Sequence, residues 1–197
     1  MPNIGILALQ GDFAEHADML ESVGARAYQV RKAEQLNDID GLIIPGGEST
    51  TICRLMAAFD LLKPLRAFAA TTPVWGTCAG MIVLARRASD LNLPSIGVLD
   101  IGVRRNAFGR QLDSFETDIS VPLIGSEPLH AVFIRAPVVE EVGPDVDVLS
   151  RLDDGRVVAV QEGHLLATAF HPELTADDRL HRHFLSMTAR PPEVGAK

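Results

Sequence analysis

Residues 76–80, with the sequence Gly-Thr-Cys-Ala-Gly, form the pattern in this chain that most directly suggests chemistry. A small residue on each side of a nucleophile, between an apolar strand and an apolar helix, is the pattern of a nucleophile elbow. The turn is sharp, so a side chain at either glycine would collide with neighbouring elements. The pattern predicts that Cys78 is a nucleophile, although a buried cysteine in a glycine-rich turn would have the same sequence.

A nucleophilic cysteine needs a base, and His171 is the best placed of the six histidines. It directly follows the apolar run 165–170, so it stands at the carboxyl end of a predicted strand, as Cys78 does. Glu173 comes two residues later and lies on the same side in extended geometry. A carboxylate there can fix the imidazole tautomer and stabilise its cation. A His-Pro turn with a surface glutamate is the alternative, but the two motifs together favour a Cys-His-Glu triad.

A third loop, residues 45–49 with the sequence Pro-Gly-Gly-Glu-Ser, follows the buried run 41–44 and should reach the same sheet edge. Paired glycines free the backbone N–H groups to point at a ligand. In an acyl-transfer enzyme, one such N–H and that of Ala79, which follows the nucleophile, would form an oxyanion hole. A plain strand-to-helix turn that needs glycine for a positive φ is the alternative.

The other cysteine and two histidines of the last predicted helix are given no catalytic role. Cys53 lies in a helical stretch without flanking glycines and should be a small core residue. His181 and His183 are two apart, do not share a helix face, and are expected on an exposed surface rather than at a metal. No GxGxxG or GxxxxGK[ST] motif occurs, so we expect neither a dinucleotide site nor a phosphate loop. We expect no metal and no cofactor.

The elements that must position these residues begin with alternating strands and helices. Strands are predicted at residues 4–9, 25–30, 41–44, 74–75, 97–101, 115–119, 129–133, 146–149, 157–161 and 165–170. Helices are predicted at 14–22, after a cap at 49–51, at 62–70, at 81–85 and at 178–188. The order of the first half predicts an α/β protein, a three-layer α/β/α sandwich, and the hairpin-rich second half predicts an antiparallel extension.

Length and charge limit the function classes. With 197 residues and 21.3 kDa, the chain should form one domain over residues 1–188, with 189–197 as a frayed tail. A net charge of −8 disfavours binding to nucleic acid or to an anionic membrane. Neither a secretory signal nor a membrane span is visible. Two cysteines in such a chain predict a cytoplasmic protein.

Cys78 with His171 and Glu173 resembles the class I (triad) glutamine amidotransferases. Further blocks match the glutaminase subunits of pyridoxal phosphate synthase, namely LQGD at 9–12, PGGESTT at 45–51, RNAFGRQ at 105–111 with DSFE at 113–116, and FIRAP at 133–137. The resemblance covers about residues 4–184. It implies a flavodoxin-like fold with a mixed, mostly parallel central sheet.

The resemblance implies hydrolysis of L-glutamine to glutamate and ammonia through a cysteinyl thioester, with the ammonia channelled to a synthase subunit in a heteromeric complex. Cys78 would be the nucleophile, His171 the proton shuttle and Glu173 the orienting carboxylate. The oxyanion hole would use Gly47 and Ala79. The implied glutamine-binding residues are Gly47, Glu48, Ser49, Arg105, Ile134 and Arg135, and the implied activation or interface residues are Gln10 and Gly46.

Three alternatives stay open at this point. A triad glutaminase serving another acceptor enzyme would share the chemistry, and only the PGGESTT and RNAFGRQ blocks distinguish it. A cysteine hydrolase or peptidase would share the elbow. A non-catalytic interaction module on the same scaffold would have no need of all three triad residues.

Overall fold

The computed structural model describes residues 1–105 and 114–189. Most of the predicted RNAFGRQ block and all but the first residue of the predicted tail therefore lie outside the described residues. The helices are α1 (Phe13–Ser22), α2 (Ser49–Ala58), α3 (Leu62–Ala69), α4 (Ala79–Leu84) and α5 (Arg179–Thr188). The strands are β1 (Asn3–Leu7), β2 (Arg26–Val30), β3 (Gly41–Ile44), β4 (Val74–Thr77), β5 (Ala85–Ala88), β6 (Leu99–Arg104), β7 (Ser114–Ile119), β8 (Leu129–Ile134), β9 (Val138–Val142), β10 (Asp147–Arg151), β11 (Val157–Glu162) and β12 (Leu165–Thr168).

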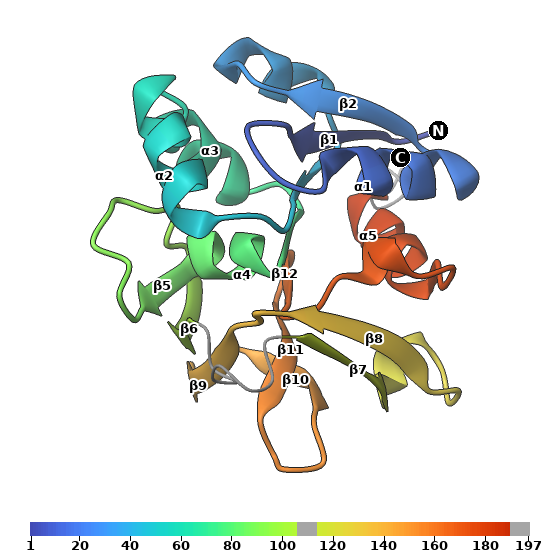
Figure 1. Ribbon diagram of the computed structural model, residues 1–197. Helices are drawn as coiled ribbons and strands as arrows, with labels where there is room; N and C mark the ends of the chain where they lie inside the picture. The colour runs from blue at the N-terminus through green and yellow to red at the C-terminus, as the bar shows by residue number, and fades with distance from the viewer. Residues whose placement is uncertain (106–113, 190–197) are drawn as a thin grey trace, which may run out of the picture.

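One large sheet has the strand order β2-β1-β3-β4-β12-β11-β9-β6-β5, with β10 paired to β11. The first five strands are parallel, β11 and β9 run antiparallel to their neighbours, and β5 is parallel to β6. In Figure 1, α2 and α3 lie on one side of this sheet and α1 and α5 on the other. The layers confirm the predicted α/β sandwich, and the order of the first five strands is that of flavodoxin.

The central strands β3, β4 and β12 are buried at every residue. Strands covered on both faces by helices need continuous apolar side chains, which explains why these runs could be recognised in the sequence. A single core cluster runs from Ile4 to Phe184. Ile44 pairs with Gly76, and Thr77 pairs with Thr168. This register brings the carboxyl ends of the three strands, and the loops that follow them, to one edge.

Two strands were not predicted from the sequence. β5 continues directly from α4 and carries exposed arginines, so its residues read as the end of a helical run. β9 has three exposed residues, and its only apolar pair stands at its start. β7 and β8 form a separate two-stranded sheet. Within the described residues, no helix is long and apolar enough to cross a membrane.

Candidate active site

Cys78 lies between β4 and α4 in a conformation that few non-glycine residues adopt, with φ 47° and ψ −101°. The two flanking glycines make this turn possible. A Cβ on Gly76 would come within 2.5 Å of the Gly80 backbone, and a Cβ on Gly80 would come within 2.0 Å of the Ile44 carbonyl oxygen. The elbow predicted from the sequence is therefore present, and it is packed too closely for any side chain at either glycine.

His171 and Glu173 follow β12, as predicted, and form a hydrogen-bonded pair. His171 Nδ1 lies 2.8 Å from Glu173 Oε1, and both residues are buried. The same nitrogen lies 3.4 Å from Asp12 Oδ2, so His171 has two carboxylates at one edge of its ring. Gly46 packs against the ring, because a Cβ there would lie 2.3 Å from His171 Cε1.

Hydrogen bonding and burial act in opposite directions on these two groups. Burial opposes a charge on His171, but hydrogen bonds with Asp12, Cys78 and Glu173 outweigh it and raise the pKa of His171 to about 12. Burial raises the pKa of Glu173, and its hydrogen bond with His171 works against that shift. At neutral pH the imidazole of His171 is therefore protonated on both nitrogens, and its positive charge lies beside Cys78.

The loop after β3 is held by the loop after β1. The Glu48 N–H donates to Gln10 Oε1 at 2.6 Å, and the Asp12 N–H donates to the Gly46 carbonyl at 3.1 Å. Gly47 has a φ of 153°, and a Cβ on it would meet Gln10 Oε1 at 2.5 Å. Gln10 thus lies directly against the glycine that the sequence assigned to the oxyanion hole.

Glu48 caps α2, a role that the sequence analysis gave to the hydroxyl residues after it. Its carboxylate accepts the N–H groups of Thr50 and Thr51 at 3.0 and 2.7 Å. Although burial opposes its charge, the hydrogen bonds with these two threonines lower the pKa of Glu48 to about 2. Arg105 Nη2 lies 3.5 Å from Glu48 Oε1 and also contacts Thr50. Two of the three charged residues assigned to glutamine, Glu48 and Arg105, are therefore neighbours.

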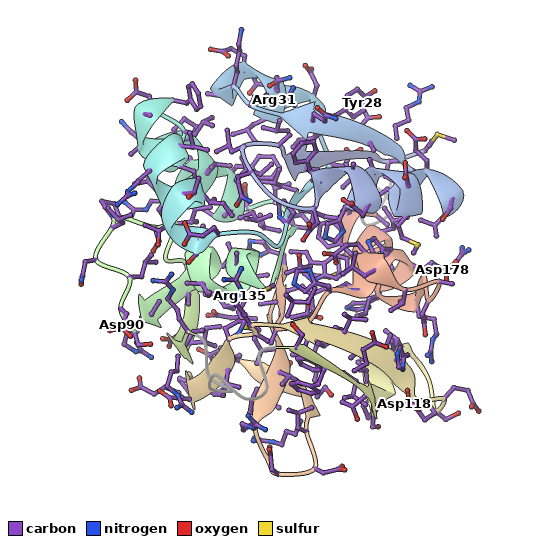
Figure 2. All side chains as sticks on the ribbon, viewed as in Figure 1. Tyr28, Arg31, Asp90, Asp118, Arg135 and Asp178 are labelled. Carbon is purple, nitrogen blue, oxygen red and sulfur yellow. The ribbon has the colours of Figure 1, made fainter. Side chains whose placement is uncertain are left out.

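Ile134 and Arg135 complete the wall opposite the loops. The Ile134 carbonyl lies 3.8 Å from Cys78 Sγ, and Arg135 has a φ of 44°, unusual for a residue with a side chain. Figure 2 places Arg135 between α4 and β8, near the middle of the molecule. The end of β8 thus turns sharply beside the nucleophile.

These residues surround one cavity of about 390 Å³. All but two of the residues singled out in the sequence lie in its wall, namely Gln10, Gly47, Glu48, Ser49, Cys78, Ala79, Arg105, Ile134, Arg135 and His171. Glu173 is outside the lining because it lies behind His171, and Gly46 because it packs against the ring. Ile82 and Asp12 also line the cavity and were not predicted.

Asp12, His171 and Glu173 offer ligand atoms within 4.8 Å of one another, which are donor types that a metal could use. Both carboxylates, however, face the same nitrogen of His171. A metal bound there would have to displace the hydrogen bond between His171 and Glu173. The cluster therefore fits an imidazole held by acids better than a metal centre.

The sequence analysis was wrong about His181, which was expected on an exposed surface. It is wholly buried, as is His16 of α1. The periodicity of α5 carried the missing signal, because His181, Phe184 and Thr188 are spaced three and four apart on its buried face. In α1, His16 similarly lies four residues before the buried Leu20.

The fold and the cavity together define an α/β protein with a cysteine at a nucleophile elbow. The SNO glutamine amidotransferase family model matches residues 6–190, and the chain therefore belongs to this family. A solved structure described as a glutamine amidotransferase superimposes with a TM-score of 0.88 at 47% identity, covering 94% of this chain and 98% of that one. A structure from Thermoplasma acidophilum, described as part of a putative GMP synthase, shares the fold at 18% identity and TM-score 0.67, with 95% and 94% coverage.

Closer sequence relatives carry one name, pyridoxal 5'-phosphate synthase subunit PdxT. The protein of Herpetosiphon aurantiacus is 56% identical over 188 residues, covering 93% of this chain and 99% of the relative. That of Roseiflexus sp. is 57% identical, covering 93% and 99%, and that of Frankia alni is 59% identical, covering 94% of each.

Proposed function

We propose that this chain hydrolyses L-glutamine to L-glutamate and ammonia, with Cys78, His171 and Glu173 as a catalytic triad. The observation that carries the proposal is that the elbow cysteine and His171 line one cavity, with the Glu173 carboxylate 2.8 Å behind that histidine. Membership of a glutamine amidotransferase family supports hydrolysis of the side-chain amide of glutamine over a peptidase activity or a non-catalytic module.

In the first half of the reaction, Cys78 Sγ has already lost its proton and attacks the side-chain amide carbon of glutamine as a thiolate. The tetrahedral intermediate collapses to a thioester when the C–N bond breaks, and His171 gives its proton to the leaving nitrogen. The raised pKa of His171 means that the imidazole holds that proton at neutral pH. Glu173 keeps Nδ1 protonated, so the other ring nitrogen faces the sulfur.

In the second half, water attacks the thioester carbon while His171 takes one of its protons. The C–S bond breaks and glutamate leaves, so one water is consumed and one ammonia released. In both halves the carbonyl oxygen becomes negatively charged in the tetrahedral intermediate. We assign the stabilisation of this charge to the N–H groups of Gly47 and Ala79. No step requires a metal or a cofactor.

Substrate recognition is assigned to the charged residues of the cavity. The planar guanidinium of Arg105 suits the α-carboxylate of glutamine. Glu48 stays ionised at neutral pH, as its lowered pKa requires, and suits the α-ammonium group. Gly47, Ser49, Ile134 and Arg135 would complete the site, all within the same cavity wall.

The biological role that we propose is the supply of ammonia to a synthase subunit that makes pyridoxal 5'-phosphate, in a heteromeric complex for vitamin B6 biosynthesis. The shared name of relatives at 56–59% identity supports this acceptor over another one. The acidic charge gives no basis for a nucleic-acid or membrane partner. Two free thiols suit the reducing cytoplasm, and one domain over residues 1–188 accounts for the activity.

Partner binding would also complete the oxyanion hole. Gln10 holds the Glu48 N–H and contacts Gly47, so a synthase subunit that displaces Gln10 would free this loop to reorient. A missing oxyanion donor costs roughly 10²–10³ in rate. We therefore expect the isolated chain to be a poor glutaminase.

The deciding experiment measures glutamate and ammonia released from free glutamine by the chain alone and with added synthase subunit, using Cys78→Ala as the control. We expect a rise of about an order of magnitude or more on addition of the partner and no activity with the variant. Full activity of Cys78→Ala would refute the triad, and equal turnover with and without the partner would refute activation.

A further inference from the structure

A buried chain of polar side chains continues from the triad into the protein interior. The second carboxylate oxygen of Glu173, Oε2, lies 3.3 Å from His16 Nε2. That nitrogen is also 3.2 Å from Thr77 Oγ1, and the opposite nitrogen, Nδ1, is 3.0 Å from His181 Nε2. His16, Thr77 and His181 have no solvent-exposed surface. The mechanism proposed above uses none of these three residues.

The two histidines are packed among aromatic rings. Trp75 lies edge-on to both, with ring centroids 5.7 Å from His16 and 4.9 Å from His181. Its Nε1–H donates to Thr168, which is also buried. This packing fixes the orientation of both imidazoles, so each ring nitrogen faces a defined neighbour.

Both histidines are neutral at physiological pH. Burial holds the pKa of His16 well below its usual range, and the electrostatic effects of His181 and His171 act in the same direction. Burial lowers the pKa of His181 to about 4, against a smaller opposite effect of Asp178. Each ring therefore has one N–H donor and one lone pair, and the question is which nitrogen carries the proton.

Two buried atoms decide between the tautomers. Among the described residues, neither Glu173 Oε2 nor His181 Nδ1 has a hydrogen-bond partner, and the 3.3 Å contact of Glu173 Oε2 with His16 Nε2 is an ion-pair distance only. If His16 carried its proton on Nδ1, its Nε2 lone pair would face the carboxylate, and His181 would bury an unpaired N–H. With the proton on Nε2, an N–H faces the carboxylate and only a lone pair of His181 stays unpaired. An unpaired buried donor is the rarer of the two.

We propose that His16 is a positioning residue for the triad: its Nε2–H, shared with Thr77 Oγ1, supplies the donor for Glu173 Oε2, and the His181 Nε2–H fixes that tautomer. The functional part of this inference rests on the proposed glutaminase activity. Glu173 is then held at both oxygens, by His171 on the cavity side and by His16 on the interior side.

The consequence is that His16 keeps Glu173 ionised. A donor to the charged form of a carboxyl lowers its pKa, and removing the donor raises it. The other groups that face Glu173 are His171, which favours the charge, and Asp12, which opposes it. Without the donor, Glu173 would hold a proton up to a higher pH and would no longer stabilise the protonated imidazole.

A matched pair of substitutions tests this. The amide nitrogen of glutamine reaches the position of a histidine Nε2, whereas that of asparagine reaches Nδ1. His16→Gln thus keeps a donor toward Glu173, and His16→Asn loses it. For His16→Asn we expect kcat at least about tenfold lower with KM within about twofold, and an acid limb of kcat against pH about one to two pH units higher. His16→Gln should retain the wild-type acid limb.

The assay uses the full chain with its synthase subunit, and His183→Gln is the matched control. His183 lies on α5, the helix that also carries His181, but it contacts Gln161, outside this network. His181→Gln should retain the wild-type acid limb. His181→Asn should shift the acid limb to higher pH, as His16→Asn does. Equal rates and equal acid limbs for His16→Gln and His16→Asn would overturn the proposal.

A measurement independent of activity covers variants that do not fold and a chain that proves not to be a glutaminase. Nitrogen-15 NMR of the labelled wild-type protein distinguishes the two imidazole tautomers. We expect His16 to be neutral with its proton on Nε2 between pH 6 and 8, and a proton on Nδ1 or on both nitrogens would refute the assignment. Wild-type protein without glutaminase activity would contradict the proposed function and leave this tautomer test standing.

Discussion

Among the described residues, two clusters bring a histidine together with two carboxylates, one at the cavity and one on the β7–β8 hairpin. In the cavity, His171 lies 2.8 Å from Glu173, and both are buried. On the hairpin, His130 lies 2.8 Å from Asp118 and 3.0 Å from Glu116, and all three side chains are at least half exposed. Figure 2 shows Asp118 on this hairpin, well away from Arg135 of the cavity.

Both clusters contain the same types of residue, but the two carboxylates face one nitrogen of His171 and opposite nitrogens of His130. The two clusters also differ in their surroundings. Hydrogen bonds raise the pKa of His130 as well as that of His171. Water and salt screen the exposed cluster, so its hydrogen bonds compete with solvent at each moment. His171 and Glu173 are buried, so solvent competes less for their hydrogen bond. Close geometry is therefore common to both clusters, and burial determines which one can hold a reactive imidazole.

The strongest test of this comparison is the same substitution at both histidines. His171→Asn removes the proton shuttle and should lower glutaminase kcat by at least about 10⁴-fold, because the triad acts as a unit. His130→Asn should leave kcat within about twofold, as expected of an exposed site away from the cavity. Steady-state assays with the synthase subunit measure both. A large loss at His130 would contradict the comparison.

Neutralising one carboxylate in each cluster should give the second largest difference. Glu173→Gln keeps size but loses charge, and should lower kcat by about 10²–10⁴-fold, since the third triad member orients and stabilises the imidazole. Glu116→Gln should leave the rate unchanged. If Glu173→Gln retained a rate within about twofold of wild type, the role given to Glu173 would be wrong.

Access to the cavity should likewise make the two cysteines react with alkylating reagents at different rates. Cys78 lines the cavity, whereas Cys53 is buried in the core, and burial raises the pKa of its thiol to about 11. A small alkylating reagent at pH 7 should modify Cys78 at least about tenfold faster, because thiols react as thiolates. Peptide mass spectrometry measures the two rates, and glutamine in excess should protect only the cavity thiol. Faster labelling of Cys53 would reverse the assignment.

The smallest effect concerns stability and the exposed cluster. The pKa of His130 is raised above 6.5 in the folded state, so the protonated form of His130 adds stability. This stability is complete below pH 6.5, the ordinary pKa of histidine in the unfolded chain, and is lost as the pH rises through the raised pKa. Between pH 6 and 9, the Tm difference between wild type and His130→Asn should fall by less than about 2 °C. Added salt should abolish it, and a salt-independent difference would argue against screening.

The sequence suggested Cys78, His171 and Glu173 as a triad because each of them follows a buried apolar strand, and the structure places them close together. Cys78 and His171 end neighbouring parallel strands, so their meeting at one sheet edge follows from general topology. The family resemblance supplied the cavity residues that no strand pattern indicates, such as Arg105 and Arg135. Parallel strands buried on both faces leave a clear apolar signal, and this made the first half of the fold predictable.

The polar residues behind the triad left no such signal. His16 and His181 belong to two helices at opposite ends of the chain, and only tertiary packing brings their nitrogens to 3.0 Å. His181 was assigned to the surface because it stands two residues from His183 and the two do not share a helix face. The periodicity of α5 places His181 on its buried face. Asp12 was missed for a similar reason, since its contact with His171 depends on how two loops meet.

The backbone of the nucleophile and that of the neighbouring loop differ in how they can open. The Cys78 N–H donates to the Thr168 carbonyl at 2.8 Å, at the end of a strand paired on both sides. Its hydrogen exchange therefore requires opening of the central sheet, at a free energy near that of global unfolding. The Glu48 N–H is held by a single side chain, that of Gln10, and can exchange through local motion. The backbone at Cys78 thus opens only when the fold opens, while the loop that carries Glu48 can rearrange within the folded protein.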